Sequence, residues 1–215
     1  MWSSRNTKKR KLLTVLDEED DGLPFPPLSF PFPKKLSTSQ VEDNRIHFSE
    51  EVNGDSMSDL KANLRSLERK LLGMKQNYRP TEDIPIYLYL NTPGGSVYDA
   101  LSVVDTIKQL KVPVYTVVEG LVASAGTLLS LSGEKRYIQP NAYMLIHEIR
   151  SSCWGRMSEI TDEYENLSKM TKQLIDFYVE HTKMNRKEVT KVLGKDITWN
   201  AQECIKKGVA DVVFQ

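Results

Sequence analysis

The sequence contains few of the residues that build disulfide frameworks or metal centres. Its 215 residues include two cysteines, Cys153 and Cys204, and three histidines. Two cysteines form neither a disulfide framework nor a metal-ligand pair, and so small a number fits a reducing compartment. We interpret Cys153 as a buried or incidental thiol, although it lies close to a histidine in the sequence.

Net charge and long apolar runs are also missing. The 29 basic residues equal the 29 acidic ones, so no global basic field steers the protein to nucleic acid. No apolar run approaches the length of a membrane span. The first residues lack a secretory apolar region, and the acidic run Asp17 to Asp21 argues against an organelle transit peptide. We expect a cytoplasmic protein with neither nucleic acid nor membrane as a partner.

Residues 1–43 predict a disordered or flexible N-terminal tail. A basic cluster at Lys8 to Lys11 and the acidic run precede LPFPPLSFPFPKK, without helical or strand period. The prolines favour an extended polyproline-type backbone and oppose a packed core. The basic cluster fits a short charged tail better than a nuclear or nucleic-acid signal. Residues 44–215 are expected to form one domain.

Within that domain, strand and helix patterns alternate. IPIYLYLN and VPVYTVVEG have the continuous apolar character of buried strands. Apolar residues at helical spacing occur at 57–71, 97–110 and 157–178, and KQNYRPTED reads as a loop. Pairs that form capping boxes predict four helix starts: Ser56 with Asp59, Ser96 with Asp99, Asn185 with Glu188, and Asn200 with Glu203. This alternation indicates an α/β fold with a largely parallel sheet.

The stretch GLVASAGTLLS places Ser124 among small residues where an apolar helix begins. A serine there is either a helix cap in a tightly packed turn or a nucleophile that a substrate backbone can approach. The N–H groups at a helix start are unpaired and carry positive partial charge. The N–H of Ala125 is therefore a candidate donor to the oxyanion of an acyl-transfer reaction.

Gly94 and Gly95 lie between a buried strand and a helix. Two glycines permit positive φ and leave the backbone uncovered. They form either a simple turn or a site where an N–H binds an oxyanion or an extended substrate chain. The segment lacks the GxGxxG spacing and the Gly-Lys-Ser/Thr ending of phosphate loops.

An acyl-transfer site also needs a base and an acid that orients it. Of the three histidines, His47 lies in a weak strand and His181 near the end of a solvated helix, whereas His147 ends the apolar strand AYMLIH. Site residues often occur where a strand meets a loop, although a lone histidine is more often structural. Spacing leaves three candidates for the acid: Asp196, Asp162 and Asp211.

Four segments carry a family resemblance: IYLYLNTPGGSV, GLVASAGTLLSLSG, RYIQPNAYMLIHE and KDITWNAQECIKKGVADVV. They resemble the proteolytic subunit of the ATP-dependent Clp protease, the ClpP serine peptidase family, over residues 84–215, and the resemblance extends back to about Asn44. The resemblance implies no metal or organic cofactor. It also implies these roles: Ser124 as nucleophile, His147 as general base, Asp196 as orienting acid, Gly95 and Ala125 as oxyanion donors, and Gly94, Glu148 and Ile149 as substrate-binding residues.

The resemblance further implies a ClpP/crotonase-like spiral of ββα units with a protruding handle helix at about Gly155 to His181. Members of that family form a homo-oligomer of two stacked seven-membered rings with the sites inside. A ring-shaped AAA+ unfoldase feeds unfolded protein or peptide substrates into the chamber. The expected function is that of a serine endopeptidase acting as the proteolytic subunit of such a protease.

Two departures from the family pattern keep other functions open. EIRSSCWG stands after His147 where the family usually carries Gln-Pro and a glycine pair, and the tail replaces a short axial segment. One alternative is an ATPase-independent protease of the viral capsid-maturation type, and another is a catalytically idle structural ring subunit. A crotonase-type acyl-CoA enzyme shares the fold, but the order Ser, His, Asp with these local motifs argues against it.

Overall fold

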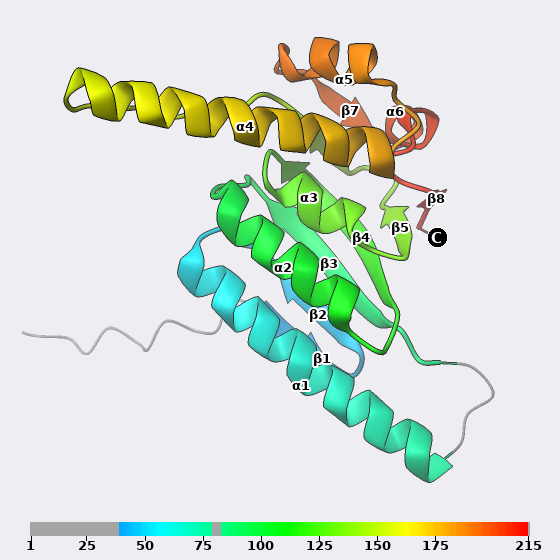
Figure 1. Ribbon diagram of the computed structural model, residues 1–215. Helices are drawn as coiled ribbons and strands as arrows, with labels where there is room; N and C mark the ends of the chain where they lie inside the picture. Colours follow the sequence, from blue (N-terminus) through cyan, green and yellow to red (C-terminus); the bar gives the residue numbers. More distant parts are fainter. Residues whose placement is uncertain (1–38, 79–82, 215) are drawn as a thin grey trace, which may run out of the picture. The chain divides into compact units, whose positions relative to one another are not determined.

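The computed structural model describes residues 39–78 and 83–214, which form an α/β fold (Figure 1). The predicted tail up to residue 38 lies outside the described residues, so the tail stays a prediction. A strand begins at Ser39, upstream of the predicted domain start at residue 44. None of the described helices is long and apolar enough to cross a membrane.

The elements follow the predicted alternation. The strands are β1 (Ser39–Glu42), β2 (Arg45–Phe48), β3 (Ile86–Thr92), β4 (Val114–Ala123), β5 (Lys135–Ile138), β6 (Tyr143–Leu145), β7 (Thr198–Asn200) and β8 (Val212–Val213). The helices are α1 (Gly54–Tyr78), α2 (Val97–Gln109), α3 (Gly126–Leu131), α4 (Met157–His181), α5 (Arg186–Leu193) and α6 (Ala201–Lys207). Strands β1 and β7 are the elements that the sequence patterns did not predict.

The strands form one sheet in the order β1-β2-β3-β4-β5-β8, with β6 on β4 and β7 on β6. Among the described strands, β1 with β2 and β6 with β7 pair antiparallel, and the other pairs are parallel. The prediction of a largely parallel sheet is confirmed. Strand β4 pairs with β5 along its first half and with β6 along its last three residues.

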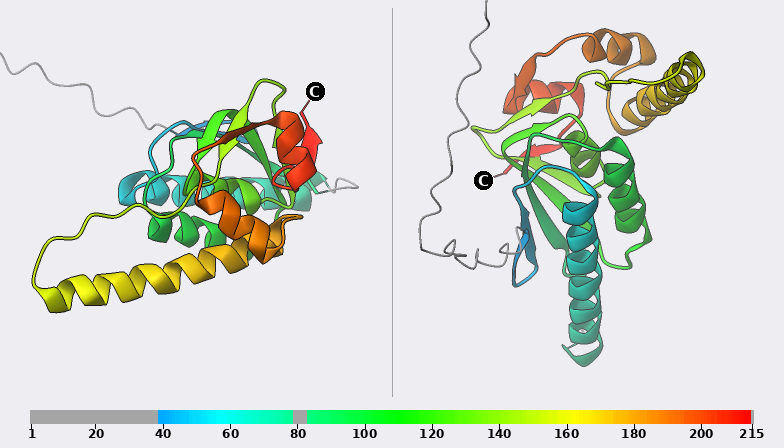
Figure 2. Two further views of the ribbon diagram at one scale, coloured as in Figure 1. Left: turned by 90° about the horizontal axis from the view of Figure 1, so that it is seen from above. Right: turned by 90° about the vertical axis from the view of Figure 1, so that its left-hand side faces the viewer.

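Helices α1, α2 and α3 cover one face of the sheet (Figures 1 and 2). The five residues predicted to form the apolar face of α1 are all buried there: Met57, Leu60, Leu64, Leu67 and Leu71. The opposite face carries a cluster of aromatic rings, in which Tyr87 packs edge-on against Tyr115 and Tyr137 against Phe214. Aromatic contacts across neighbouring strands stabilise the pairing of those strands.

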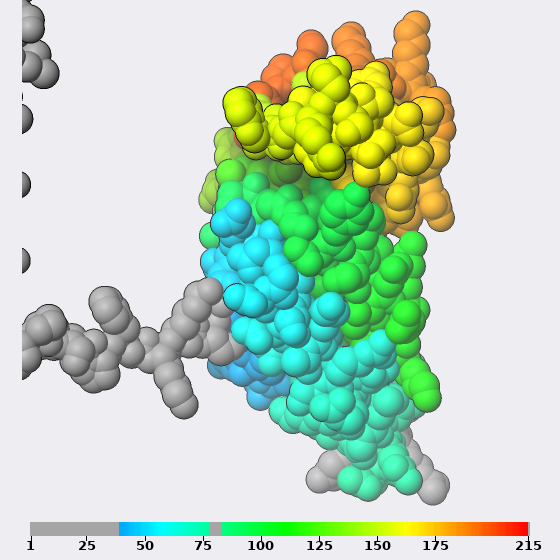
Figure 3. Space-filling model, turned by 60° about the vertical axis from the view of Figure 1, so that its left-hand side comes forward, coloured from blue at the N-terminus to red at the C-terminus, as the bar shows by residue number. Residues whose placement is uncertain are grey.

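Helix α4 is buried only along its second half. Met170, Leu174 and Tyr178 contact the core, as the helical pattern predicted. Met157 and Tyr164 belong to the same predicted face but are 75% and 71% exposed. The first half of the helix extends beyond the neighbouring elements (Figure 2) and forms a ridge on the surface (Figure 3).

The helix starts follow the predicted capping boxes with one correction. Asn185 with Glu188 and Asn200 with Glu203 form complete boxes, and Ser96 caps α2. The box predicted for Ser56 and Asp59 is wrong. Helix α1 starts earlier, because the Ser56 N–H donates to Asn53 Oδ1 at 3.0 Å and the Asn53 N–H donates to Ser56 Oγ at 3.1 Å. The predicted loop is also too long, since α1 continues through Tyr78.

An ion pair joins β5, β8 and the end of α4. The Arg136 N–H and Nε each donate to Asp211 Oδ2 at 3.0 Å, and Arg136 Nη1 donates to the carbonyl of His181. Partial burial by itself would raise the pKa of the Asp211 carboxyl. The hydrogen bonds and charge of Arg136 outweigh that effect and hold this pKa below its ordinary value.

We predict that Asp211→Asn lowers the free energy of unfolding at neutral pH by roughly 1 kcal/mol, because the pair is only partly buried. A carboxyl whose pKa is depressed in the folded state stabilises the fold above its unfolded pKa of about 3.9. That contribution is lost as the pH falls through the folded pKa, so the difference from wild type shrinks below about pH 4. Urea unfolding at several pH values measures it.

Asp176→Asn is the matched control, because Asp176 pairs with Arg186 on the surface with both side chains at least 60% exposed. It is expected to cost less than about 0.5 kcal/mol. An equal cost for both variants would contradict the structural role given to Asp211.

Candidate active site

Three parallel strands end at the same edge of the sheet, and each is followed by a predicted site residue. Thr92 of β3 pairs with Val122 of β4, and Ala123 of β4 pairs with Leu145 of β6. Continuing the first register by two residues sets Gly94 level with Ser124. The Pro-Gly-Gly turn, the serine turn and the segment that leads to His147 therefore meet at this edge.

Strand β7 brings Asp196 to the same edge. It runs antiparallel to β6 with Leu145 opposite Thr198, so two further residues set His147 opposite Asp196. His147 Nδ1 lies 3.0 Å from Asp196 Oδ1. A carboxylate only accepts hydrogen bonds, so Nδ1 carries a proton, and in the neutral ring Nε2 keeps its lone pair. This is the tautomer in which a histidine acts as a general base through Nε2.

Ser124 occupies a strained turn between β4 and α3. Its φ of 52° lies in the left-handed region, which costs a non-glycine residue about 1–2 kcal/mol. Three hydrogen bonds to its backbone hold it there: its N–H donates to the Leu145 carbonyl at 2.8 Å, and its carbonyl accepts from the Thr127 N–H at 3.0 Å and from the Thr127 side-chain Oγ1 at 2.6 Å. Ser124 is partly buried at the strand end, and Ala125 rather than Ser124 is the N-cap residue of α3.

A buried hydroxyl pair connects this turn to helix α4. Thr127 Oγ1 lies 2.7 Å from the hydroxyl of Tyr178. The Ser124 carbonyl can only accept, so the Thr127 hydroxyl donates to it and accepts from Tyr178. Burial raises the pKa of Tyr178 to about 12, despite the opposing effect of the bond to Thr127. Tyr178 therefore stays protonated and acts as the donor.

The two glycines pack against the serine turn. A Cβ on Gly94, whose φ is 94°, would lie 2.6 Å from the Ala123 carbonyl oxygen and 2.7 Å from Ser124 Cβ. A Cβ on Gly95 would lie 2.2 Å from the Val52 carbonyl oxygen. Only glycine fits at either position. Within residues 39–78 and 83–214, no hydrogen bond uses the N–H of Gly95 or of Ala125, which leaves both available to a ligand.

The remaining predicted residues lie near this edge or away from it. The Glu148 N–H donates to the Leu193 carbonyl at 2.8 Å, so only the carbonyl and side chain of Glu148 remain for a substrate. Ile149 is partly buried against the core. Asp162 lies in α4, and Asp211 pairs with Arg136. Cys153, expected to be buried or incidental, is exposed.

The other two histidines have contacts of their own. His47 stacks on Tyr89, with the ring centroids 4.5 Å apart. His181 stacks on Phe177, and its Nδ1 lies 2.9 Å from the Phe177 carbonyl. His47 Nδ1 also lies 3.8 Å from Glu119 Oε2, but of the three histidines His147 is the one within hydrogen-bond distance of a carboxylate.

The sequence patterns missed Arg150. Its guanidinium forms an ion pair with Asp196 Oδ2, the oxygen that His147 does not use. Arg150 lies in a segment without periodicity, 46 residues before its partner. No local pattern in the sequence predicts this contact.

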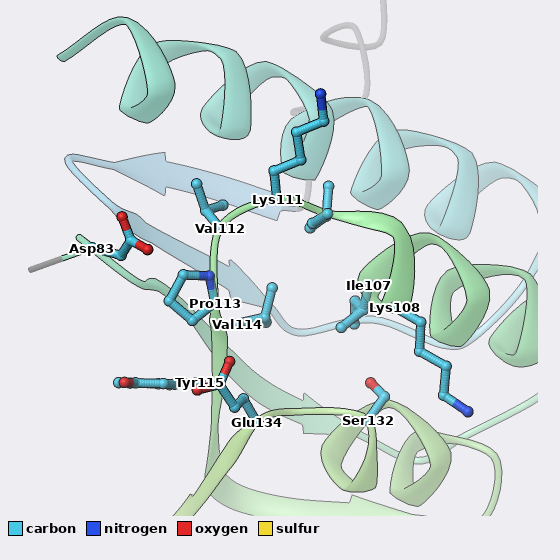
Figure 4. A pocket seen from close by; sticks show the side chains of 11 residues that line it. Asp83, Ile107, Lys108, Lys111, Val112, Pro113, Val114, Tyr115, Ser132 and Glu134 are labelled. Carbon is cyan, nitrogen blue, oxygen red and sulfur yellow. The ribbon is translucent and has the colours of Figure 1, made fainter. Parts of the chain in front are cut away.

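A cavity of about 610 Å³ lies at the turn between α2 and β4 (Figure 4). Val114, Tyr115 and Glu134 are among its lining residues. Val114 begins the strand that Ser124 follows, so some 30 Å of extended chain separates the cavity from the serine. The cavity is not part of the candidate active site. The described residues also hold no cluster of three or more His, Cys, Asp or Glu side chains that could bind a metal ion.

Comparison with known proteins identifies the family. The Clp protease family matches residues 35–215. The ATP-dependent Clp protease proteolytic subunit 1 of Chlamydia muridarum is 33% identical over 178 residues, covering 81% of this chain and 88% of its own. Subunit 1 of Chlamydia pneumoniae is 34% identical with the same coverage. Subunit 2 of Treponema denticola is 37% identical over 58% of this chain and 64% of its own.

The chain therefore belongs to the Clp protease family, as its four sequence segments predicted. Its mixed α/β fold is consistent with that family. Nothing in the comparisons favours the capsid-maturation, structural-subunit or acyl-CoA alternatives.

We predict that Thr127→Val lowers the free energy of unfolding by about 1–3 kcal/mol, because it leaves the buried Tyr178 hydroxyl without an acceptor. It also removes one of the bonds to the Ser124 carbonyl, so reaction of Ser124 with an active-site label should slow. The double variant Thr127→Val/Tyr178→Phe removes both polar groups and should be more stable than the two single losses predict. Urea unfolding of wild type, Thr127→Val, Tyr178→Phe and the double variant gives the coupling energy between the two hydroxyl groups.

Thr106→Val is the matched control. The Thr106 hydroxyl is buried and donates to the Ser102 carbonyl at 2.9 Å within α2, with no third group depending on it among the described residues. This variant should cost about 1 kcal/mol or less and leave labelling unchanged. Additive losses at Thr127 and Tyr178 would contradict the hydrogen-bonded chain.

Proposed function

We propose that this protein is a serine endopeptidase, the proteolytic subunit of an ATP-dependent Clp-type protease. The observation that carries the proposal is the His147–Asp196 hydrogen bond at the strand edge where the strained turn presents Ser124. A serine at the strand edge where a histidine is hydrogen-bonded to a carboxylate is the group of residues that acyl transfer needs. Family membership supports the same reaction class.

In this mechanism, Ser124 Oγ attacks the carbonyl carbon of a peptide bond while His147 Nε2 takes its proton. Asp196 accepts a hydrogen bond from His147 Nδ1–H and stabilises the imidazolium that forms. The N–H groups of Gly95 and Ala125 bind the tetrahedral oxyanion. His147 then returns the proton to the leaving amine, and water releases the acyl group by the same steps in reverse order. Gly94, Glu148 and Ile149 border the path of the substrate chain.

We infer the partners of this protein from the names of its relatives. Their printed names make them proteolytic subunits of ATP-dependent Clp proteases, so we propose that this chain also works with an ATP-hydrolysing partner of the AAA+ unfoldase class. Unfolded protein or peptides are then its substrates, cut inside a homo-oligomeric chamber of two seven-membered rings in the cytoplasm. The exposed apolar residues on the first half of α4 offer a surface for contact between subunits.

We predict that a fluorophosphonate adds once to the wild-type protein and not to Ser124→Ala, as measured by intact mass. Peptide hydrolysis should fall by several orders of magnitude in Ser124→Ala and His147→Ala, and by about 10⁴ in Asp196→Asn, because the last change favours the wrong histidine tautomer.

Ser132→Ala is the matched control, because Ser132 follows the last residue of α3, the helix that begins just after Ser124. Its hydroxyl donates to the Leu129 carbonyl and has no catalytic role in this mechanism, so labelling should be unchanged. A folded and assembled wild-type protein that takes up no label would refute the proposed function and return attention to a structural ring subunit.

A further inference from the structure

We infer that Arg150 is a positioning residue that orients the Asp196 carboxylate toward His147. The inference rests on the proposed function, because it assigns Arg150 a part in the same site. Arg150 lies in the segment EIRSSCWG, in which this chain departs from the pattern of its family.

The two oxygens of Asp196 have different partners. Oδ1 lies 3.0 Å from His147 Nδ1, and Oδ2 pairs with Arg150 Nη2. Asp196 follows α5 and precedes β7, and its side chain is 57% exposed. No other side-chain hydrogen bond to this carboxylate occurs among the described residues. Without Arg150, only Oδ1 of the carboxylate would have a protein partner. Water would then bind Oδ2 and leave the carboxylate free to rotate.

Arginine suits this role. Its planar guanidinium bonds a carboxylate in a preferred plane, whereas a lysine offers a point charge on a flexible stem. Fixing the plane of Asp196 fixes the direction of the lone pair that faces His147 Nδ1. An orienting acid contributes to catalysis through that direction, because it sets the tautomer and the angle of the imidazole ring.

The backbone of the Arg150 segment is fixed against the end of α5. The Glu148 N–H donates to the Leu193 carbonyl. Glu148 lies between His147 and Arg150 in the sequence, and Leu193 lies three residues before Asp196. One short segment therefore presents both partners of Asp196 from a common anchor. The side chain of His147 is 13% exposed and that of Arg150 is 68% exposed, so the pair combines a sheltered contact with a solvated one.

The alternative is that Arg150–Asp196 is a surface ion pair without influence on the reaction. The structure supplies a matched pair of that kind in Arg186 and Asp176, whose side chains are 60% and 62% exposed, compared with 68% and 57% for Arg150 and Asp196. The two pairs are chemically alike and similarly solvated. Only the first has a carboxylate that also contacts a histidine.

The experiment compares Arg150→Gln, Arg150→Lys and Arg186→Gln with wild type in the full-length, assembled protein. We expect Arg150→Gln to lower the rate constant of fluorophosphonate labelling and kcat for a peptide by about fivefold, the upper range for an exposed ion pair. KM should stay unchanged, because Arg150 acts through Asp196 and not on the substrate. Arg150→Lys should restore part of the loss, and Arg186→Gln should match wild type.

Salt provides a second measurement. At about 1 M salt, where charges are screened beyond about 3 Å, the wild-type rate should fall toward that of Arg150→Gln, while Arg150→Gln itself changes little. Arg186→Gln should show the same salt dependence as wild type.

The outcomes separate this inference from the proposed function. Wild-type labelling at Ser124 with an unchanged rate in Arg150→Gln overturns the inference and leaves the proposed function intact. So does an equal loss in Arg186→Gln, or a change confined to KM, which would make Arg150 a substrate contact. Absence of Ser124-dependent labelling in wild type overturns both.

Discussion

Strand β4 pairs with three other strands, and the position of every candidate catalytic residue depends on that pairing. Its first half lies between β3 and β5, and its last residues pair with β6. Because these pairs are parallel, the Pro-Gly-Gly turn, Ser124 and the segment after β6 all leave the sheet at one edge. Strand β7 then adds Asp196 by running antiparallel to β6. A slip of one residue in any of these registers would turn the side chains of that strand to the opposite face and separate Ser124, His147 and Asp196.

The strained conformation of Ser124 is stable because its surroundings hold it on several sides. Its carbonyl accepts two hydrogen bonds from Thr127, its N–H is bound by β6, and Gly94 leaves room for its Cβ. All residues of α3 behind it are buried. The small residues around Ser124 therefore let α3 enter the core directly after the strand, and they leave the backbone at the turn uncovered.

The sequence predicts this fold well where the pattern is strong and local. Leu60, Leu64 and Leu67 repeat at helical spacing, which predicts the buried face of α1. The segments that form β3 and β4 are continuous apolar runs, and their composition predicts that these strands are buried. Prediction fails where a contact depends on tertiary structure. Strand β7 is three residues long and has no period to read. The choice of Asp196 over Asp162 and Asp211 came from family resemblance, because spacing cannot show that an antiparallel register will set it opposite His147. Arg150 was missed for the same reason.

The exposed half of α4 raises a physical problem that the single chain does not solve. Helices in water are marginal without packing along an apolar face, yet Met157 and Tyr164 are open to solvent and the preceding Trp154 is 99% exposed. Exposed apolar surface of this kind is typical of an interface. The segment that leads into this half of α4 also carries Arg150, which pairs with Asp196. A neighbouring subunit that packed against α4 would restrict that segment as well, so in the proposed assembly the orientation of Asp196 and the contact between subunits would depend on the same few residues between His147 and the start of the helix.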